Sequence, residues 1–180
     1  MSATPPGWDL EVLIDAATID QRVRELGAQI SKDYSGAPVN LIGILKGSWV
    51  FLADLIRHLK LPVTVDFLGV QSYGRGVKPS GEVKITKDLD HSIEGSDVLI
   101  VEDILDTGET FHYLQDVLGR REPRSLKVVA LLDKPSRRIQ PVKADYVGFT
   151  IPDVFVVGYG LDLAQQYRNL PDVRICQAEE

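Results

Sequence analysis

Three acidic side chains that stand close together in the chain, Glu102, Asp103 and Asp106, are the first residues whose types and spacing suggest chemistry. Two adjacent carboxylates can accept both hydrogen bonds that a vicinal diol donates. A dianionic phosphate needs small residues with exposed amides and hydroxyls, and residues of this kind follow at once: Thr107, Gly108 and Thr110. The stretch therefore combines groups suited to a diol with groups suited to a phosphate.

The elements on either side must position these groups. Residues 98–101 are four large apolar residues in a row, which predicts a central strand of a parallel sheet, buried on both faces. Residues 111–118 have the apolar spacing of a helix face. The ligand crevice of an open α/β sheet lies outside the carboxyl ends of its strands, and the turn before a helix presents free N–H groups. The simpler alternative is that Asp103 or Asp106 only caps the helix.

A second strand and helix are predicted at residues 39–45 and from Trp49 onward. Lys46 and Gly47 lie in the turn between them, where a lysine beside a glycine can approach a phosphate closely, although a solvated lysine is the ordinary interpretation. A further strand is predicted from residue 63, and it leads into a glycine-rich stretch that begins with Ser72 and Tyr73. That stretch is either a plain surface loop or a lid that shields a reacting centre from water.

Composition limits the class of protein. The chain has 180 residues, of which 44% are hydrophobic and 26% charged, which predicts one soluble globular domain over residues 1–180 with a tail at residues 1–8. A net charge of −6 with both signs scattered along the chain suggests no nucleic-acid partner and no anionic membrane surface. A single cysteine and the lack of a basic leader or an 18-residue apolar run predict a cytoplasmic location with no membrane partner.

Other kinds of site find little support. The three histidines have no companion at a metal-ligand spacing, so a zinc site is not indicated, and neither a G-x-S-x-G elbow nor a G-x-x-x-x-G-K-[ST] loop is present. The residues VLIVED also suit the opening of a receiver-type signalling domain. That hypothesis leaves roughly 97 preceding residues unexplained and about 83 for the domain, fewer than usual.

The run VLIVEDILDTGET at residues 98–110 resembles the phosphoribosyl-pyrophosphate (PRPP) signature of the type I phosphoribosyltransferases. The resemblance implies that Glu102 and Asp103 contact the ribose hydroxyls. It implies that the loop wraps the 5′-phosphate with four residues, namely Asp106, Thr107, Gly108 and Thr110. Asp106 is then the general acid or base that moves the purine N7 proton.

Residues 146–171 resemble the base-binding region of the bacterial hypoxanthine phosphoribosyltransferases. This implies that Phe155 stacks on the purine and that Val156 offers main-chain groups to its edge. Asp162 is then expected near a magnesium ion bound to pyrophosphate, and Arg168 near the pyrophosphate itself. Without the resemblance, a core aromatic in a strand is the preferred interpretation of Phe155.

Lys134 follows the apolar residues 127–132, so it is expected at the carboxyl end of another strand. In purine-specific members of the family, a lysine placed in this way donates to O6 of the base. A 6-oxopurine presents an acceptor there and adenine presents an amino donor, so the lysine would reject adenine. Hypoxanthine, guanine and xanthine all carry O6, and the sequence does not rank them.

The turn with Lys46 and Gly47 resembles the family's pyrophosphate loop, in which the peptide bond that corresponds to Leu45–Lys46 is often cis. Residues 72–84 resemble its mobile catalytic loop, to which Ser72 and Tyr73 belong. The cofactor implied is Mg²⁺, held near carboxylates on two parts of the chain, namely Glu102, Asp103 and Asp162.

Strands and helices alternate along the chain, which predicts an α/β fold with a mainly parallel central sheet flanked by helices. The resemblance implies in addition a small hood, built from N- and C-terminal segments, over the base site. The activity implied is transfer of the phosphoribosyl group from PRPP to N9 of a 6-oxopurine, in a homodimer or homotetramer. A regulator of the same fold that binds RNA is the alternative, and the acidic composition argues against it.

Overall fold

The computed structural model describes residues 8–72 and 83–178. Its larger sheet has the strand order β4-β3-β2-β5-β6-β7, and every neighbouring pair is parallel except β3 with β4. The strands of this sheet are β2 (Val39–Leu45), β3 (Val63–Ser72), β4 (Val83–Lys87), β5 (Asp97–Leu105), β6 (Ser125–Asp133) and β7 (Tyr146–Thr150). The mainly parallel sheet that the sequence predicts is confirmed.

The apolar run at the start of β5 occupies the middle of this sheet, with β2 on one side and β6 on the other. Val98, Leu99, Ile100 and Val101 are all fully buried. Leu99 and Val101 pack into the hydrophobic cluster on one face, and Val98 and Ile100 into the cluster on the other. Successive side chains of a strand point to opposite faces, so a strand covered on both faces needs an unbroken apolar run.

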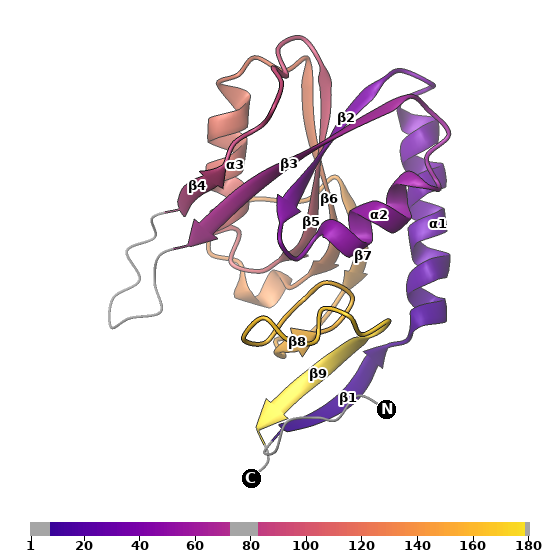
Figure 1. Ribbon diagram of the computed structural model, residues 1–180, viewed down its shortest axis with the longest axis vertical. Helices are drawn as coiled ribbons and strands as arrows, with labels where there is room; N and C mark the ends of the chain where they lie inside the picture. The colour runs from indigo at the N-terminus through magenta and orange to yellow at the C-terminus, as the bar shows by residue number, and fades with distance from the viewer. Residues whose placement is uncertain (1–7, 73–82, 179–180) are drawn as a thin grey trace.

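Helices cover both faces of the sheet, as predicted (Figure 1). α1 (Ala16–Asp33) and α2 (Trp49–Ile56) bury Leu26 and Phe51 against one face. α3 (Glu109–Gly119) buries Phe111 and Leu114 against the other. Each such side chain contributes roughly 1.5–3 kcal/mol through the apolar area that it removes from water. The two layers hold the sheet, and hence the carboxyl ends of its strands, in one position.

Strands from the two ends of the chain form a second, three-stranded sheet with the order β1-β9-β8. They are β1 (Trp8–Ile14), β8 (Val156–Val157) and β9 (Val173–Ala178), paired antiparallel. This sheet lies at one end of the molecule, below the larger sheet in Figure 1. The expected hood of N- and C-terminal segments is therefore present, although the predicted tail at residues 1–8 is one residue too long, because Trp8 already belongs to β1.

Thr18 and Gln21 have the spacing of a capping box, which predicts a first helix that begins after Thr18. The observed start of α1 differs from this prediction, and so do the ends of the predicted catalytic loop. α1 begins at Ala16, where Asp15 is the N-cap and its Oδ1 accepts a hydrogen bond from the Thr18 amide at 2.9 Å. Of the predicted loop at residues 72–84, Ser72 ends β3 and residues 83–84 begin β4, while Tyr73 lies outside the described residues. Within the described part of the chain, no helix is long and apolar enough to cross a membrane.

Candidate active site

The acidic pair lies in the last part of β5 rather than after it. β5 pairs with β2 as far as Val101, whereas its pairing with β6 continues through Glu102 to Leu105. The pairing of β5 with β2 therefore ends just before the acidic pair, although β2 itself continues beside β3 to Leu45. The Glu102 side chain is buried and that of Asp103 is half-buried.

Burial controls the charge of this pair. It raises the pKa of Glu102 well above its usual range, and the neighbouring Asp103 carboxylate adds to that effect. Burial also raises the pKa of Asp103 to about 6, against the opposing effects of the Ile104 amide, which donates to Oδ1 at 2.8 Å, and of Arg168. Two carboxylates that are hard to ionise together favour a ligand that brings positive charge or hydrogen-bond donors.

The turn between β2 and α2 lies directly on the acidic pair. The Leu45–Lys46 peptide bond is cis, as expected from the resemblance. Ser48 is fully buried and its hydroxyl donates to the Ile44 carbonyl oxygen at 2.7 Å, which closes the turn. A Cβ atom added to Gly47 would lie 1.5 Å from Asp103 Oδ2, so the turn can approach the carboxylate only with glycine at this position.

The loop after β5 is a helix N-terminus, as predicted, but neither aspartate caps the helix. Gly108 is the N-cap of α3, with a left-handed φ of 86° and no side-chain cap. A Cβ at Gly108 would lie 2.6 Å from Val142 Cγ2, and the Thr107 carbonyl oxygen accepts from the Ile139 amide at 2.9 Å. The segment after β6 therefore supports the loop through the Thr107 carbonyl oxygen. The N-terminal amides of α3 can bind an anion, and that of Glu109 donates to Thr107 Oγ1 at 3.4 Å in this structure.

Asp106 contacts the same supporting segment. Its Oδ1 atom lies 3.0 Å from Arg137 Nε in an ion pair. Lys134 is the only residue of this segment that the sequence marks as a site residue, and no motif indicates the contact of Arg137 with Asp106. Only the folding of the β6–β7 connection back over the β5–α3 turn brings Arg137 to Asp106.

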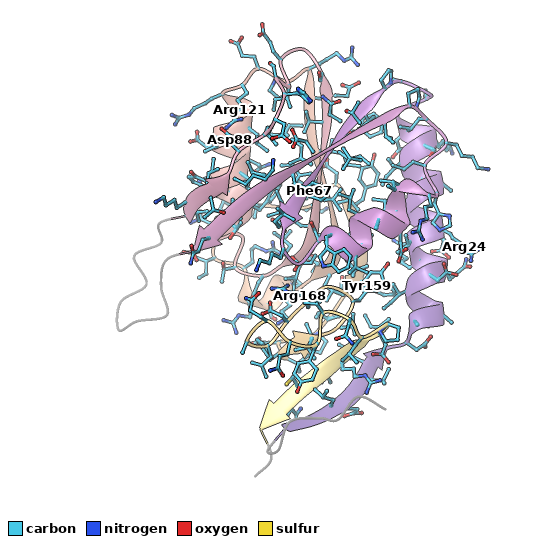
Figure 2. All side chains as sticks on the ribbon, in the orientation of Figure 1. Arg24, Phe67, Asp88, Arg121, Tyr159 and Arg168 are labelled. Atoms are coloured by element: carbon cyan, nitrogen blue, oxygen red, sulfur yellow. The ribbon has the colours of Figure 1, made fainter. Side chains whose placement is uncertain are left out.

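The loop between β8 and β9 carries Arg168, which is a cation of the site in addition to Lys46 (Figure 2). Arg168 is paired with Asp162 Oδ1 at 2.8 Å and also donates to the Gly160 carbonyl oxygen at 2.7 Å. The Gln165 amide oxygen accepts from Lys46 Nζ at 3.1 Å. No motif in the sequence marks Gln165. Only the fold shows that it lies next to the two cations, Lys46 and Arg168.

A cleft of about 310 Å³ joins these parts. It brings together ten of the residues that the sequence analysis names as site residues. They are Lys46, Gly47, Glu102, Asp103, Asp106, Thr107, Gly108, Thr110, Asp162 and Arg168. Their convergence from separate segments gives one cleft that is lined by carboxylates, by the two cations Lys46 and Arg168 and by a helix N-terminus.

Three of the named purine-site residues, Lys134, Phe155 and Val156, do not line this cleft. Lys134 is buried just after β6, and its amide donates to the Leu105 carbonyl oxygen at 3.0 Å, next to Asp106. Val156 is buried in β8. Phe155 is 48% exposed, so the alternative of a core aromatic is wrong, and the ring is free to receive a ligand.

The carboxylates fit a metal ion that arrives with its substrate. Among the described residues, no group of three or more acidic, histidine or cysteine side chains forms a metal cage. Mg²⁺ is commonly bound by one or two carboxylates together with substrate phosphates and water. The raised pKa values of Glu102 and Asp103 show that their negative charge lacks full compensation, which a divalent cation would provide.

Residues 13–164 match the family described as phosphoribosyl transferase domain, and the chain belongs to that family. Curated relatives carry more specific names. The chain is 53% identical over 166 residues to the hypoxanthine phosphoribosyltransferase of Salmonella typhimurium, covering 91% of this chain and 93% of the relative. It is 51% identical over 168 residues to the hypoxanthine-guanine phosphoribosyltransferase of Bacillus subtilis, covering 93% of each.

Solved structures agree with this assignment. A hypoxanthine-guanine phosphoribosyltransferase from Bacillus anthracis has a TM-score of 0.88 at 48% identity, covering 92% of this chain and 97% of that chain. A hypoxanthine phosphoribosyltransferase from Staphylococcus aureus has a TM-score of 0.89 at 50% identity, covering 93% and 91%. The predicted type I phosphoribosyltransferase fold is confirmed, and the receiver-domain alternative is wrong.

Proposed function

We propose that this enzyme transfers the 5-phosphoribosyl group of PRPP to N9 of hypoxanthine or guanine, which gives IMP or GMP and pyrophosphate in purine salvage. The observation that carries the proposal is the cleft in which the β5 carboxylates, the α3 N-terminus and the cations Lys46 and Arg168 converge. A phosphorylated sugar with a diphosphate leaving group is complementary to each of these parts. The family membership supports the same reaction.

PRPP would bind with its two phosphate-bearing ends in different parts of the cleft. The 5′-phosphate suits the amides and hydroxyls of Thr107, Gly108 and Thr110 at the start of α3. The ribose hydroxyls suit Glu102 and Asp103, which accept hydrogen bonds and stabilise positive charge that develops at C1 as pyrophosphate leaves.

The leaving group would lie between Lys46 and Arg168, beside the backbone of Gly47, which also lines the cleft. Lys46 and Arg168 already stand on either side of Gln165, within 3.1 Å and 3.5 Å of its Oε1 atom. The divalent metal that phosphoribosyltransferases generally use is proposed to be Mg²⁺, held near Glu102, Asp103 and Asp162. When bound, it spreads the charge of the leaving pyrophosphate.

The purine would lie over the edge formed by the ends of β5 and β6. We assign Asp106 as the group that removes or relays the N7 proton while N9 attacks C1, and its position on the cleft wall supports that role. Lys134 would donate to O6, Phe155 would stack on the ring and Val156 would offer main-chain groups. Ser72 and Tyr73 would begin the loop that closes over the reacting carbon.

Turnover with PRPP and Mg²⁺ tests the function. Hypoxanthine, guanine, xanthine and adenine are offered separately, and nucleotide and pyrophosphate are both measured. We expect product from the 6-oxopurines and none from adenine. Product from none of the four bases would contradict the proposed activity.

Two variants test the assignments on the cleft. Asp106→Asn retains the size of the side chain but cannot take a proton, so kcat should fall by roughly 10²–10⁴-fold. Lys134→Met loses the donor to O6, so the preference for hypoxanthine over adenine should shrink by at least about tenfold. Full turnover by the first variant, or unchanged discrimination by the second, would overturn the respective role.

We also propose a cytoplasmic homodimer or homotetramer. Trp49 is 48% exposed and lies in a mostly apolar groove of about 800 Å³ between α1, α2 and the loop at residues 159–171. A second copy of the chain would cover this surface. Light scattering on the purified protein decides the question, because a monomer at micromolar concentration would contradict it.

A further inference from the structure

Arg137 joins three segments of the active-site region. It ends the short helix η1 (Pro135–Arg137), which follows β6. Its Nε atom lies 3.0 Å from Asp106 Oδ1 in the β5–α3 turn, and its Nη1 donates to Asp153 Oδ1 at 3.2 Å in the turn before β8. The two contacts use different nitrogens of one planar guanidinium group, so their relative positions are coupled.

The contact with Asp106 is selective for one carboxylate oxygen. Oδ1 is buried and, apart from the ion pair, has no hydrogen-bond partner in the described part of the chain. The Asp106 side chain as a whole is nevertheless 39% exposed, so its exposed area lies on its other atoms, among which Oδ2 is the remaining oxygen. Arg137 thus holds one oxygen inward and leaves the other for a ligand in the cleft.

The contact with Asp153 reaches the purine side of the site. Asp153 lies two residues before Phe155, in a turn closed by the Val154 amide, which donates to the Pro152 carbonyl oxygen at 2.9 Å. Any shift of Arg137 therefore acts on Asp106 and on the turn that leads to Phe155. The two assigned functions, proton transfer and base stacking, share this one support.

No neighbouring cation takes the place of Arg137 beside Asp106 among the described residues. Arg138, the next residue, is directed to Asp133 and to the Leu105 carbonyl oxygen. Among the described residues, Arg137 is the cation paired with Asp106. A lysine at position 137 would keep the charge but could not present two nitrogens in the same plane.

We propose that Arg137 is a positioning residue for phosphoribosyl transfer, which orients the Asp106 carboxylate toward the purine and fixes the turn that carries Phe155 relative to it. The proposal rests on the role assigned above to Asp106. It extends the set of functional residues to one that lies outside the cleft lining and that no motif marks.

The first test is a set of single variants assayed for kcat and for the KM of hypoxanthine and of PRPP. Arg137→Met removes both contacts, so kcat should fall about 10–100-fold and the hypoxanthine KM should rise severalfold, with the PRPP KM nearly unchanged. Asp153→Asn weakens only the contact on the purine side, so the hypoxanthine KM should rise while kcat stays within about twofold. Arg137→Lys should recover part of the kcat lost in Arg137→Met.

A matched control is Arg120→Met, which removes the same charge from an exposed pair with Asp116 on α3. Its kinetic constants should equal those of the unmodified enzyme. If the two methionine variants behave alike, the loss at Arg137 is one of net charge and the proposal is overturned.

A double-mutant cycle separates this proposal from the assignment of Asp106. In the Asp106→Asn background, Arg137→Met should reduce kcat by less than about twofold, because its effect acts through the carboxylate. Equal losses in both backgrounds would overturn the positioning role. Full turnover by Asp106→Asn alone would instead overturn the role of Asp106, which is a separate outcome.

Added guanidinium ion separates a positioning role from a purely structural one, because a purely structural role of Arg137 would leave kcat unchanged when the ion is added. In Arg137→Ala, millimolar guanidinium should raise kcat at least threefold over the same concentration of sodium ion, because it can occupy the place between the two carboxylates. The thermal midpoint is measured in parallel to show that the variant is folded. Absence of rescue in a folded Arg137→Ala protein, together with an unchanged hypoxanthine KM in Asp153→Asn, would overturn the proposal.

Discussion

Gly47 and Asp103 meet so closely that a single methyl group between them is excluded: a Cβ on Gly47 would lie 1.5 Å from Asp103 Oδ2. A third segment closes on the same turn, because a Cβ on Gly160 would lie 2.2 Å from the Gly47 carbonyl oxygen. The turn at Gly47 is therefore enclosed between the acidic pair and the loop before Asp162. This close packing is possible because neither Gly47 nor Gly160 has a side chain.

Gly47→Ala should for this reason displace either the turn or the Asp103 carboxylate. We expect kcat/KM for PRPP to fall by at least about 100-fold, since misplacement by 1 Å can cost that much. Steady-state kinetics with varied PRPP measures the loss. An active Gly47→Ala enzyme with unchanged kcat/KM would show that the turn has another position open to it.

Gly119→Ala is the matched control. Gly119 ends α3, and a Cβ there would meet nothing within 4 Å. The change should leave kcat/KM unaltered and should stabilise the helix by up to roughly 1 kcal/mol, because alanine loses less backbone entropy on folding.

Stability should depend on pH through the acidic pair. The pKa of Asp103 is raised from its ordinary 3.8 to about 6, and that of Glu102 is raised too. Between about pH 4 and 6 the folded state keeps a proton that the unfolded chain releases, so the free energy of unfolding of the ligand-free enzyme falls as pH rises through this range.

Asp103→Asn removes the contribution of Asp103 to that dependence. Above pH 6 the variant should be more stable than the unmodified enzyme by on the order of 1–3 kcal/mol, and the difference should vanish below about pH 4. Thermal unfolding at a series of pH values without ligand measures this. Mg²⁺ with PRPP should stabilise the unmodified enzyme more than the variant. A difference that stays constant with pH would refute the explanation.

Gln165 should matter for the pyrophosphate end of the substrate. Its Oε1 accepts from Lys46 Nζ at 3.1 Å and lies 3.5 Å from Arg168 Nη2. Gln165→Ala should raise the KM for PRPP several-fold and leave the hypoxanthine KM unchanged, because both cations lose a shared neighbour. Gln166→Ala, at the next exposed position, is the control and should change neither constant.

Tyr159 ties the loop before Asp162 to α2 (Figure 2). Its hydroxyl donates to Asp54 Oδ2 at 2.7 Å, and burial together with that carboxylate raises the pKa of Tyr159. Tyr159→Phe should reduce the free energy of unfolding by about 1 kcal/mol and lower the thermal midpoint by roughly 2–4 °C. In a double-mutant cycle with Asp54→Ala, the second change should add little. Fully additive losses would show that the bond is not made in solution.

Local patterns in the sequence account for the elements that carry the central chemistry. The apolar run of β5, the helix spacing after Gly108 and the small residues between them are contiguous, so their structure follows from strand and helix periodicity. The same holds for β2 and the turn with Gly47. The start of α1 differs from the capping box at Thr18, because Asp15 caps the helix three residues earlier.

The sequence by itself determined the α/β class, the strand that bears Glu102 and Asp103, and the helix N-terminus beside them. Only the tertiary structure decided that Lys46 meets Gln165, 119 residues away, and that Arg137 pairs with Asp106. It also placed the strand that begins at Trp8 beside the last strand of the chain. The physical reason is that periodicity reports only which face of an element is buried, whereas these contacts depend on how distant elements pack and close the chain on itself.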